Sequence, residues 1–276
     1  IKGKARKTIL GELAAGTVSI LVGTHALFQD EVVFRRLGLI VVDEQHRFGV
    51  HQRLHLAAKG VDGGHPHQLA LTATPIPRSL AMVTYGDLDC SVIDELPPGR
   101  TPITTTLIDT DRREAVIRRV GAACGNGRQA YWVCTAIEES DSLDLEAAEA
   151  TRDYLGEALP EVRIGMVHGR MKAPEKAEMM ANFKSGFIQL LVATTVIEVG
   201  VDVPNASLMI IDNAERLGLA QLHQLRGRVG RGVVESHCLL LYRQPLSETA
   251  RERLQVMQQT HDGFVIAEAD LRIRGP

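Results

Sequence analysis

The chain has 276 residues, of which 45% are hydrophobic and 24% are charged. This composition supports a buried core and excludes a disordered tail, and the length fits two lobes of ordinary size. The net charge of -3 excludes a strongly basic protein, so any contact with nucleic acid must come from local patches.

The cysteine pattern and the length of the apolar runs predict the cellular compartment of the protein. Cys90, Cys124, Cys134 and Cys238 form no CxxC pair, so we expect free thiols in a reducing cytoplasm rather than disulfides or zinc. No apolar run reaches the roughly 20 residues that span a bilayer, and no signal peptide is recognisable. The chain starts at Ile1 rather than at Met, and we expect it to be a piece of a longer protein.

Apolar runs rich in Val, Ile and Leu alternate with segments of helical spacing. Near-continuous runs predict strands covered on both faces, as in parallel sheets, and the alternation predicts an α/β fold. Helices are predicted at Asp111–Ala123, with a capping box of Asp111 and Glu114, and at Ala173–Lys184, with Pro174 in the first turn. The predicted strands are Val18–Val22, Leu39–Asp43, Gln68–Thr72, Thr105–Ile108, Ala130–Cys134, Val162–Val167, Ile188–Ala193, Leu208–Asp212 and Cys238–Tyr242.

A Pro/Gly-rich stretch, Glu95–Pro102, cannot lie inside a sheet and is interpreted as a linker between two lobes. Beyond the last strand, helical spacing returns at Ser247–Gln259 and Asp262–Arg272. The predicted domains are 1–95 (an incomplete first lobe), 96–103 (the linker), 104–245 (the second lobe) and 246–276 (the start of a helical region).

Paired carboxylates end the first of the long apolar runs. Asp43 at the end of that strand could hold Mg²⁺, which prefers oxygen ligands and keeps part of its water shell. Glu44 could orient or deprotonate an attacking water. Gln45 and His46 follow directly, and the alternative is a strand that runs into an acidic turn.

Two further strand ends carry hydroxyl groups. Thr72 and Thr74 could hydrogen-bond to the acid pair at the end of the adjacent strand, although a simple Thr/Pro turn is equally possible. Thr194 and Thr195 leave a buried strand where hydroxyls and amides could meet DNA phosphates. Further along, Gly200 and Asp202 could contact a nucleotide ribose. The alternative for these last four residues is an ordinary strand and turn.

A basic segment, Gln224–Arg231, places Arg228 and Arg231 three residues apart, so that on a helical turn they would face the same way. Two guanidinium groups aimed at one point suit a triphosphate whose γ-phosphate gains charge in the transition state. The alternative is a solvated basic face, which the glycines between the arginines disfavour.

Together these segments resemble the superfamily 2 helicases, with motifs in the usual order. Asp43–His46, Leu71–Thr74, Val192–Pro204 and Gln224–Arg231 are similar to motifs II, III, V and VI. The DNA-contact motifs of the family are similar to Ile20–Leu27, with Thr24 and His25, and to Val167–Met171, with His168 and Gly169; Arg78 follows motif III. Within the superfamily, Asp43–Val50 and Ala269–Pro276 resemble the RecG family.

This resemblance implies two RecA-like lobes, ATP and Mg²⁺ as cofactors, and translocation on double-stranded DNA. It also implies remodelling of branched DNA at stalled forks and Holliday junctions, by a monomer in the bacterial cytoplasm at the nucleoid. Contact with a single-strand-binding protein is left open. The implied metal ligands are Asp43 and Glu44, and the implied nucleotide-binding residues are Gly200, Asp202, Gln224, Arg228 and Arg231.

The chain departs from the family in lacking a phosphate-binding loop of the form Gly-x-x-x-x-Gly-Lys-Thr/Ser. We therefore expect the isolated chain to hydrolyse ATP barely or not at all. One alternative is a transcription-repair coupling translocase, which more often carries Glu where this chain has Gln45. A second is a non-catalytic nucleic-acid-binding module, which the intact Asp43, Glu44, Arg228 and Arg231 disfavour.

Trp132 is an isolated feature with two interpretations. It could stack on a nucleic-acid base, but its position within a predicted strand favours packing in the core.

Overall fold

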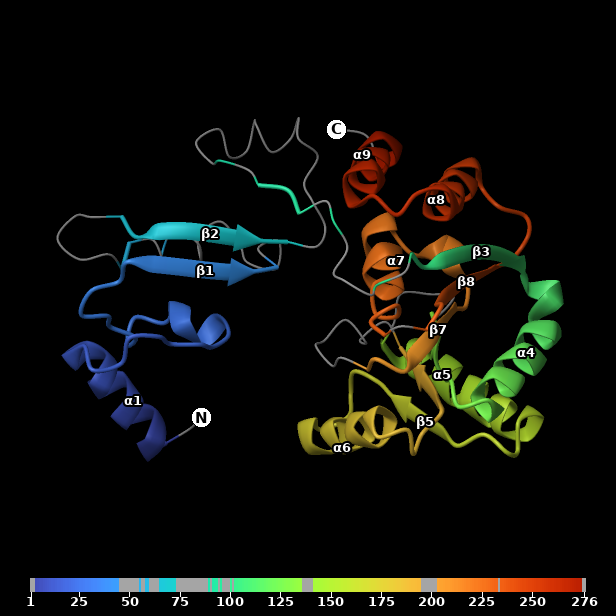
Figure 1. The fold of residues 1–276 in the computed structure, drawn as a ribbon, viewed down its shortest axis with the longest axis horizontal. Helices are drawn as coiled ribbons and strands as arrows, with labels where there is room; N and C mark the ends of the chain where they lie inside the picture. The colour runs from blue at the N-terminus through green and yellow to red at the C-terminus, as the bar shows by residue number, and fades with distance from the viewer. Residues whose placement is uncertain are drawn as a thin grey trace. The chain divides into compact units, whose positions relative to one another are not determined.

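The computed structural model describes residues 3–44, 55, 58–59, 65–72, 89, 91–93, 95, 100, 102–135, 141–194, 203–232 and 234–274. The chain divides into two compact units, Ile1–Ala73 and Thr74–Pro276 (Figure 1). Most of the predicted linker 96–103 lies outside the described residues, so the predicted domain boundaries stay predictions.

The first unit contains one α-helix and a pair of parallel strands among its described residues. Helix α1 (Lys4–Ala15) ends at Gly16, which adopts a left-handed conformation with a φ of 79° that suits glycine. Strands β1 (Leu39–Asp43) and β2 (His67–Leu71) pair in parallel, with Asp43 opposite Leu71. The predicted strand Leu39–Asp43 has the predicted bounds, and β2 lies one residue before its prediction at both ends. The expected burial on both faces is wrong for this pair, because Ile40 is the one buried residue of β1 and every residue of β2 is exposed.

The predicted strand Val18–Val22 is wrong. This segment has no strand pairing, and Ile20 and Val22 are 81% and 89% exposed. An apolar run forms a strand only where a neighbouring strand accepts and donates its backbone hydrogen bonds. Within the part of the chain that the structure describes, β1 and β2 bond to each other and not to this segment.

Six parallel strands form the sheet of the second unit, in the order β3-β8-β7-β4-β6-β5. Figure 1 labels β3, β8, β7 and β5 of this sheet. The strands are β3 (Thr104–Asp109), β4 (Gln129–Val133), β5 (Ile164–Val167), β6 (Leu190–Ala193), β7 (Ala206–Ile211) and β8 (His237–Tyr242). The helices are α4 (Arg113–Gly125), α5 (Asp141–Ala158), α6 (Ala173–Lys184), α7 (Leu219–Arg226), α8 (Glu248–Gln259) and α9 (Gly263–Arg274). Short 3-10 helices are η1 (His25–Phe28) in the first unit and η3 (Thr110–Arg112) and η5 (Ala214–Arg216) in the second.

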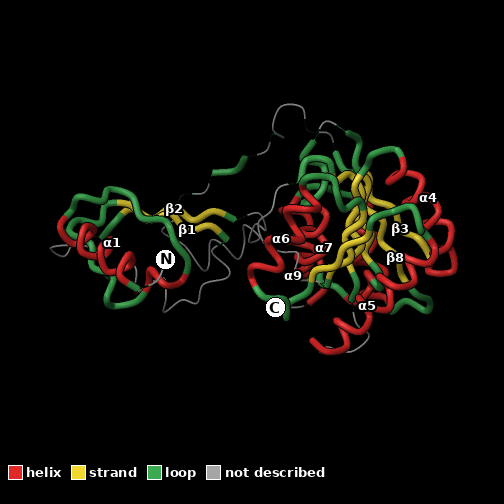
Figure 2. The backbone as a smooth tube through the Cα atoms, turned by 90° about the horizontal axis from the view of Figure 1, so that it is seen from below, coloured by secondary structure: helices red, strands yellow, loops and turns green. Residues whose placement is uncertain are grey.

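Helices cover both faces of this sheet (Figure 2). On one face, Ala130 and Trp132 of β4 share a buried core with side chains of α4 and α5. On the other face, Tyr131 and Val133 share a core with Phe183 of α6 and with side chains of α7, α8 and α9. All five residues of β4 are buried, which explains why the run Ala130–Val133 is continuously apolar rather than alternating. The α/β class expected from the sequence is confirmed.

The helix boundaries follow local capping. The predicted helix Ala173–Lys184 is confirmed as α6, with Pro174 in its first turn. The predicted capping box of Asp111 and Glu114 is wrong, because Asp109 accepts the N–H of Asp111 over 3.0 Å and η3 precedes α4. A short carboxylate side chain two residues before a free N–H satisfies that donor without a longer-range partner.

The predicted helical region after β8 is confirmed by α8 and α9. Ser247 caps α8 by accepting the N–H of Ala250 over 3.2 Å, and Asp262 accepts the N–H of Phe264 over 2.8 Å at the start of α9. Helix α9 packs against both α7 and α8. None of the described helices is both long enough and apolar enough to cross a membrane.

Candidate functional site

Polar residues follow β1 and β2 at the carboxyl ends of these parallel strands. Asp43 is the last residue of β1, and Glu44 follows it with a left-handed φ of 52°. Glu44 donates its backbone N–H to Asp43 Oδ1 over 2.9 Å, which orients the Asp43 carboxylate. Because Asp43 lies opposite Leu71, Thr72 comes one position beyond, at the same edge of the sheet. The structure therefore brings Asp43, Glu44 and Thr72 to one edge.

The oxygen donors at this edge suit a hydrated magnesium ion. Asp43 is exposed, so its carboxylate can reach an ion that keeps several waters. No cluster of three or more His, Cys, Asp or Glu side chains is placed to hold a metal in the described ranges. An ion held here would take most of its ligands from water and from phosphate oxygens, which is the usual coordination of Mg²⁺ at nucleotide sites.

Several predicted site residues lie outside the described residues, and their roles stay predictions. These are Gln45, His46, Thr74, Arg78, Thr195, Gly200 and Asp202. In the first unit, Thr24 and His25 are both exposed at the start of η1, where Thr24 O accepts the N–H of Leu27 over 2.9 Å.

In the second unit, two predicted DNA contacts lie side by side. Val167 of β5 is paired with Ala193 of β6, so the next residues, His168 and Thr194, are neighbours at the carboxyl ends of their strands. Thr194 is 4% exposed, and among the described residues neither its Oγ1 nor the buried Nδ1 of His168 has a hydrogen-bond partner. Buried polar atoms are normally hydrogen-bonded, so two unsatisfied atoms at adjacent strand ends indicate a place for a polar ligand. Gly169 is exposed directly after His168.

The arginine segment does not lie on a helical turn, which corrects the sequence prediction. Helix α7 ends at Arg226, and Gly227–Gly232 is a loop in which Gly230 has a left-handed φ of 76°. Gly230 comes four residues after the last residue of α7 and turns the chain in a conformation that favours glycine, which is a local signal against a helix through Arg231. Gln224 lies in the last turn of α7, whereas Arg228 and Arg231 are half-buried in the loop. Arg231 Nε donates to Gly227 O over 3.4 Å.

Sequence reasoning missed Arg226, which is 3% exposed. Its Nη1 donates to Met257 O and Thr260 O, each over 2.9 Å, and thereby satisfies carbonyls at the end of α8. Its Nη2 lies 3.1 Å from Nδ1 of His223. The helical spacing contained a signal, because Arg226 comes four residues after Leu222 and so lies on the same buried face of α7.

Burial and charge set the protonation of the groups around Arg226. Burial first, and then the positive charges of Arg226 and His261, lower the pKa of His223 to about 4, with Asp262 opposing them. Burial and Arg226 also lower the pKa of His261. Neutral His223 can accept a hydrogen bond from Arg226, so the cluster is compatible with a single positive charge.

Asp212 is a second residue that the sequence did not single out. It follows β7, and its Oδ2 accepts from Trp132 Nε1 over 2.7 Å and from Arg113 Nη2 over 3.0 Å. The Arg113 guanidinium also lies over the ring of Trp132, 5.2 Å from its centroid. Thr135 Oγ1 donates to Asp212 O over 2.7 Å and ties the ends of β4 and β7 together. The expectation that Trp132 packs in the core is confirmed, since it is fully buried.

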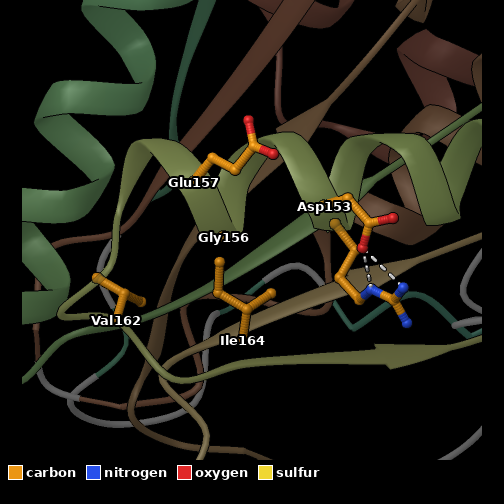
Figure 3. Close-up of a pocket in the computed structure, with 6 residues that line it drawn as sticks. Asp153, Gly156, Glu157, Val162 and Ile164 are labelled. Carbon is orange, nitrogen blue, oxygen red and sulfur yellow. Dashed lines mark hydrogen bonds and ion pairs between the residues drawn. The ribbon is translucent and has the colours of Figure 1, made fainter.

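A shallow hollow of about 610 Å³ lies elsewhere, on α5 and β5, and Figure 3 shows it. Arg152 and Asp153 pair with each other at its rim over 2.7 Å. The lining residues are Arg152, Asp153, Gly156, Glu157, Val162 and Ile164. None of them was predicted from the sequence as a site residue.

Two family matches cover most of the chain. Residues 1–83 match the DEAD/DEAH box helicase family, and residues 112–233 match the helicase conserved C-terminal domain. The "ATP-dependent DNA helicase RecG" of Escherichia coli (strain K12) is 66% identical over 277 aligned residues, which is 100% of this chain and 40% of that protein. The protein of the same name from Bacillus subtilis (strain 168) is 50% identical over 277 residues, which again cover 100% of this chain and 40% of that protein.

Solved structures agree with these matches. A structure titled "Structure of RecG bound to three-way DNA junction" superposes with a TM-score of 0.76 at 42% identity, covering 100% of this chain and 35% of that chain. The S. cerevisiae protein Dbp5, bound to RNA and ADP BeF3, superposes with a TM-score of 0.58 at 14% identity, covering 87% of this chain and 61% of that chain, and supports the fold alone.

The fold and these matches place the chain among proteins that combine the DEAD/DEAH box helicase domain with the helicase conserved C-terminal domain, in the α/β architecture that the sequence predicted. Within that class the chain belongs to the RecG family. It spans about 40% of the length of the curated relatives that it matches.

Proposed function

We propose that the protein is an ATP-dependent DNA helicase that translocates on double-stranded DNA and remodels branched DNA. The observation that carries this proposal is the pair Asp43 and Glu44, held together at the carboxyl end of a parallel strand. The relatives support it, because they are named ATP-dependent DNA helicases and one RecG structure holds a three-way DNA junction. We further propose that it acts as a monomer in the bacterial cytoplasm at the nucleoid.

ATP hydrolysis requires charge stabilisation and a positioned water. Asp43 would hold Mg²⁺ through its carboxylate, and Glu44 would orient the attacking water and accept its proton. The bound ion would neutralise charge on the phosphate oxygens. Arg228 and Arg231 would stabilise the charge that grows on the γ-phosphate, and Gln224 would lie beside them at the end of α7. Thr72 and Thr74 would relay the state of the nucleotide, and Gly200 and Asp202 would contact its ribose.

The DNA backbone would be held at strand ends of both units. In the second unit, the unsatisfied Thr194 Oγ1 and His168 Nδ1 can each bond to a phosphate, with Gly169 allowing close approach of the backbone. Thr195 would contribute a further contact there. In the first unit, the exposed Thr24 and His25 would also contact the DNA backbone. Arg78 would add a positive charge that attracts the DNA phosphates.

The test is ATP hydrolysis by the full-length gene product with no DNA, linear duplex and a forked junction. The proposal predicts the strongest stimulation by the fork. Equal stimulation by linear duplex and fork would instead indicate a general duplex translocase of the transcription-repair coupling type. The absence of hydrolysis under all three conditions would contradict the motor and leave a nucleic-acid-binding module.

The proposed DNA contacts have their own test in binding measurements. Thr194→Val removes the unsatisfied hydroxyl at nearly constant volume, and Thr260→Val is the matched control in a different part of the same unit. We expect Thr194→Val to weaken duplex affinity by roughly 1 kcal/mol, the size of one hydrogen bond, and Thr260→Val to leave it unchanged. An unchanged affinity in Thr194→Val would remove this residue from the proposed DNA interface.

A further inference from the structure

We propose that Arg100 is a positioning residue for ATP hydrolysis, because it holds the loop that carries Arg228 and Arg231. Arg100 lies four residues before β3, and its Nε donates to Gly230 O over 2.9 Å across 130 residues of sequence. It does not reach the reacting atoms in this proposal. It acts through Gly230, and the inference rests on the proposed ATP hydrolysis.

The loop Gly227–Gly232 is confined at Val229 and Gly230, which lie between the two arginines. Val229, between Arg228 and Gly230, is fully buried in the core. Gly230 packs so closely on Ile103 that an added Cβ would lie 2.8 Å from Ile103 Cγ1. Ile103 in turn packs against the same core as Val229.

The far end of the loop is equally confined. A Cβ added to Gly232 would lie 2.4 Å from the carbonyl oxygen of Pro204, so this position admits no side chain without movement of backbone. Between the two tight glycines stands Arg231. Arg228 and Arg231 are half-buried, and their neighbours Val229, Gly230 and Gly232 have little room to move. The position of the loop backbone therefore determines where the two guanidinium groups can reach.

A charged donor is well suited to fix this loop. Gly230 is buried and in a left-handed conformation, so its carbonyl oxygen points away from the hydrogen bonds that a continuing helix would make. The guanidinium of Arg100 satisfies that carbonyl with a charge-assisted bond, which is shorter and stronger than a neutral one. Arg100 lies four residues before the start of β3, so the same bond fastens the approach to β3 at Arg100 to the arginine loop.

The test compares Arg100→Ala, Arg100→Lys and Arg119→Ala in the full-length gene product, with fork-stimulated ATP hydrolysis as the first readout. Arg119 is an exposed arginine on α4 and serves as the matched control for loss of charge. Misplacement of transition-state groups by a fraction of an ångström lowers kcat rather than substrate affinity. We therefore expect Arg100→Ala to lower kcat about ten- to a hundredfold with little change in KM for ATP. Arg100→Lys, which keeps a donor and the charge, recovers part of the loss.

A second readout separates this inference from the proposed function. Hydrogen–deuterium exchange of the amides in residues 227–232 reports the order of the loop without any need for hydrolysis. We expect faster exchange in Arg100→Ala, with wild-type exchange in Arg119→Ala. Wild-type exchange together with wild-type kcat in Arg100→Ala would overturn the inference while leaving ATP hydrolysis intact. No hydrolysis by the wild-type protein would instead overturn the proposed function and, with it, the catalytic meaning of Arg100.

Discussion

Arg226 donates a hydrogen bond to the carbonyl oxygen of Met257 over 2.9 Å and thereby joins the last residue of α7 to the last turn of α8. The same nitrogen reaches Thr260 O over 2.9 Å. Helix ends leave carbonyls without partners, and a buried helix end needs them satisfied. The guanidinium of Arg226 therefore takes the place of a capping residue for α8 and links it to the helix that precedes the arginine loop.

Replacement of Arg226 should destabilise the second unit strongly. Arg226→Met keeps much of the volume but leaves both carbonyl oxygens buried without a donor, which we expect to cost about 3 kcal/mol of the free energy of unfolding. Denaturant unfolding measures the difference. The exposed Arg118→Met is the control and should change stability by less than about 0.5 kcal/mol. A similarly small effect of Arg226→Met would contradict the role given to this arginine.

Stability should fall at acidic pH because of His223. Its pKa is lowered in the folded chain to about 4 from the ordinary 6.5, so the unfolded chain binds a proton over this range while the folded chain does not. The free energy of unfolding should therefore decrease as the pH falls from about 6.5 to about 4, by on the order of 3 kcal/mol, and His261 acts in the same direction. Unfolding at a series of pH values checks this slope, which His223→Gln should flatten. An unchanged slope in that variant would assign the pH dependence to other groups.

We expect the Asp212 carboxylate to stabilise the second unit, because it accepts hydrogen bonds from two donors. Asp212→Ala leaves Trp132 Nε1 and the Arg113 guanidinium without their acceptor, and we expect a loss of about 2 to 3 kcal/mol in stability. Asp212→Asn keeps an acceptor oxygen and should lose less. Trp132 fluorescence provides the readout during unfolding, because it is the single tryptophan of the chain. Equal stability of the two variants would mean that the acceptor oxygen is not the important group.

The buried cysteines should be inert in the folded protein. Burial raises the pKa of Cys124 to about 11 and that of Cys238 to about 12, so almost no thiolate is present at pH 8. Iodoacetamide should alkylate neither residue until the protein unfolds, as peptide mass spectrometry would detect. Rapid alkylation of Cys238 in the native state would show that the core between β8 and α8 opens readily. The expectation of free thiols is confirmed for the described Cys124, Cys134 and Cys238.

Sequence patterns predicted the elements whose signals are local. Leu39–Asp43 and Ala173–Lys184 have the predicted bounds, because a continuous apolar run and a Pro174 start define them within the segment itself. The failure at Val18–Val22 has the opposite cause, since a strand depends on a partner elsewhere in the chain. The helical turn expected at Arg228 and Arg231 was wrong because α7 ends at Arg226 and the left-handed Gly230 turns the loop between the two arginines.

In the candidate site too, features with a local sequence signal could be predicted and contacts between distant residues could not. The strand-end position of Asp43, Glu44 and Thr194 could be predicted, because it follows from where an apolar run stops. The bonds of Asp212 to Trp132 and Arg113 could not, because they join residues 80 and 99 positions apart. The bond from Arg100 to Gly230 spans 130 positions and has no local signal either.

The most direct test of the account is the single-turnover rate of ATP hydrolysis by the Glu44→Gln variant of the full-length gene product with forked DNA. Glutamine keeps the shape of Glu44 but cannot accept a proton from water. The account predicts a rate at least about a hundredfold below that of the wild-type protein, with ATP binding retained. A wild-type rate in Glu44→Gln would contradict the placement of the chemistry at the end of β1.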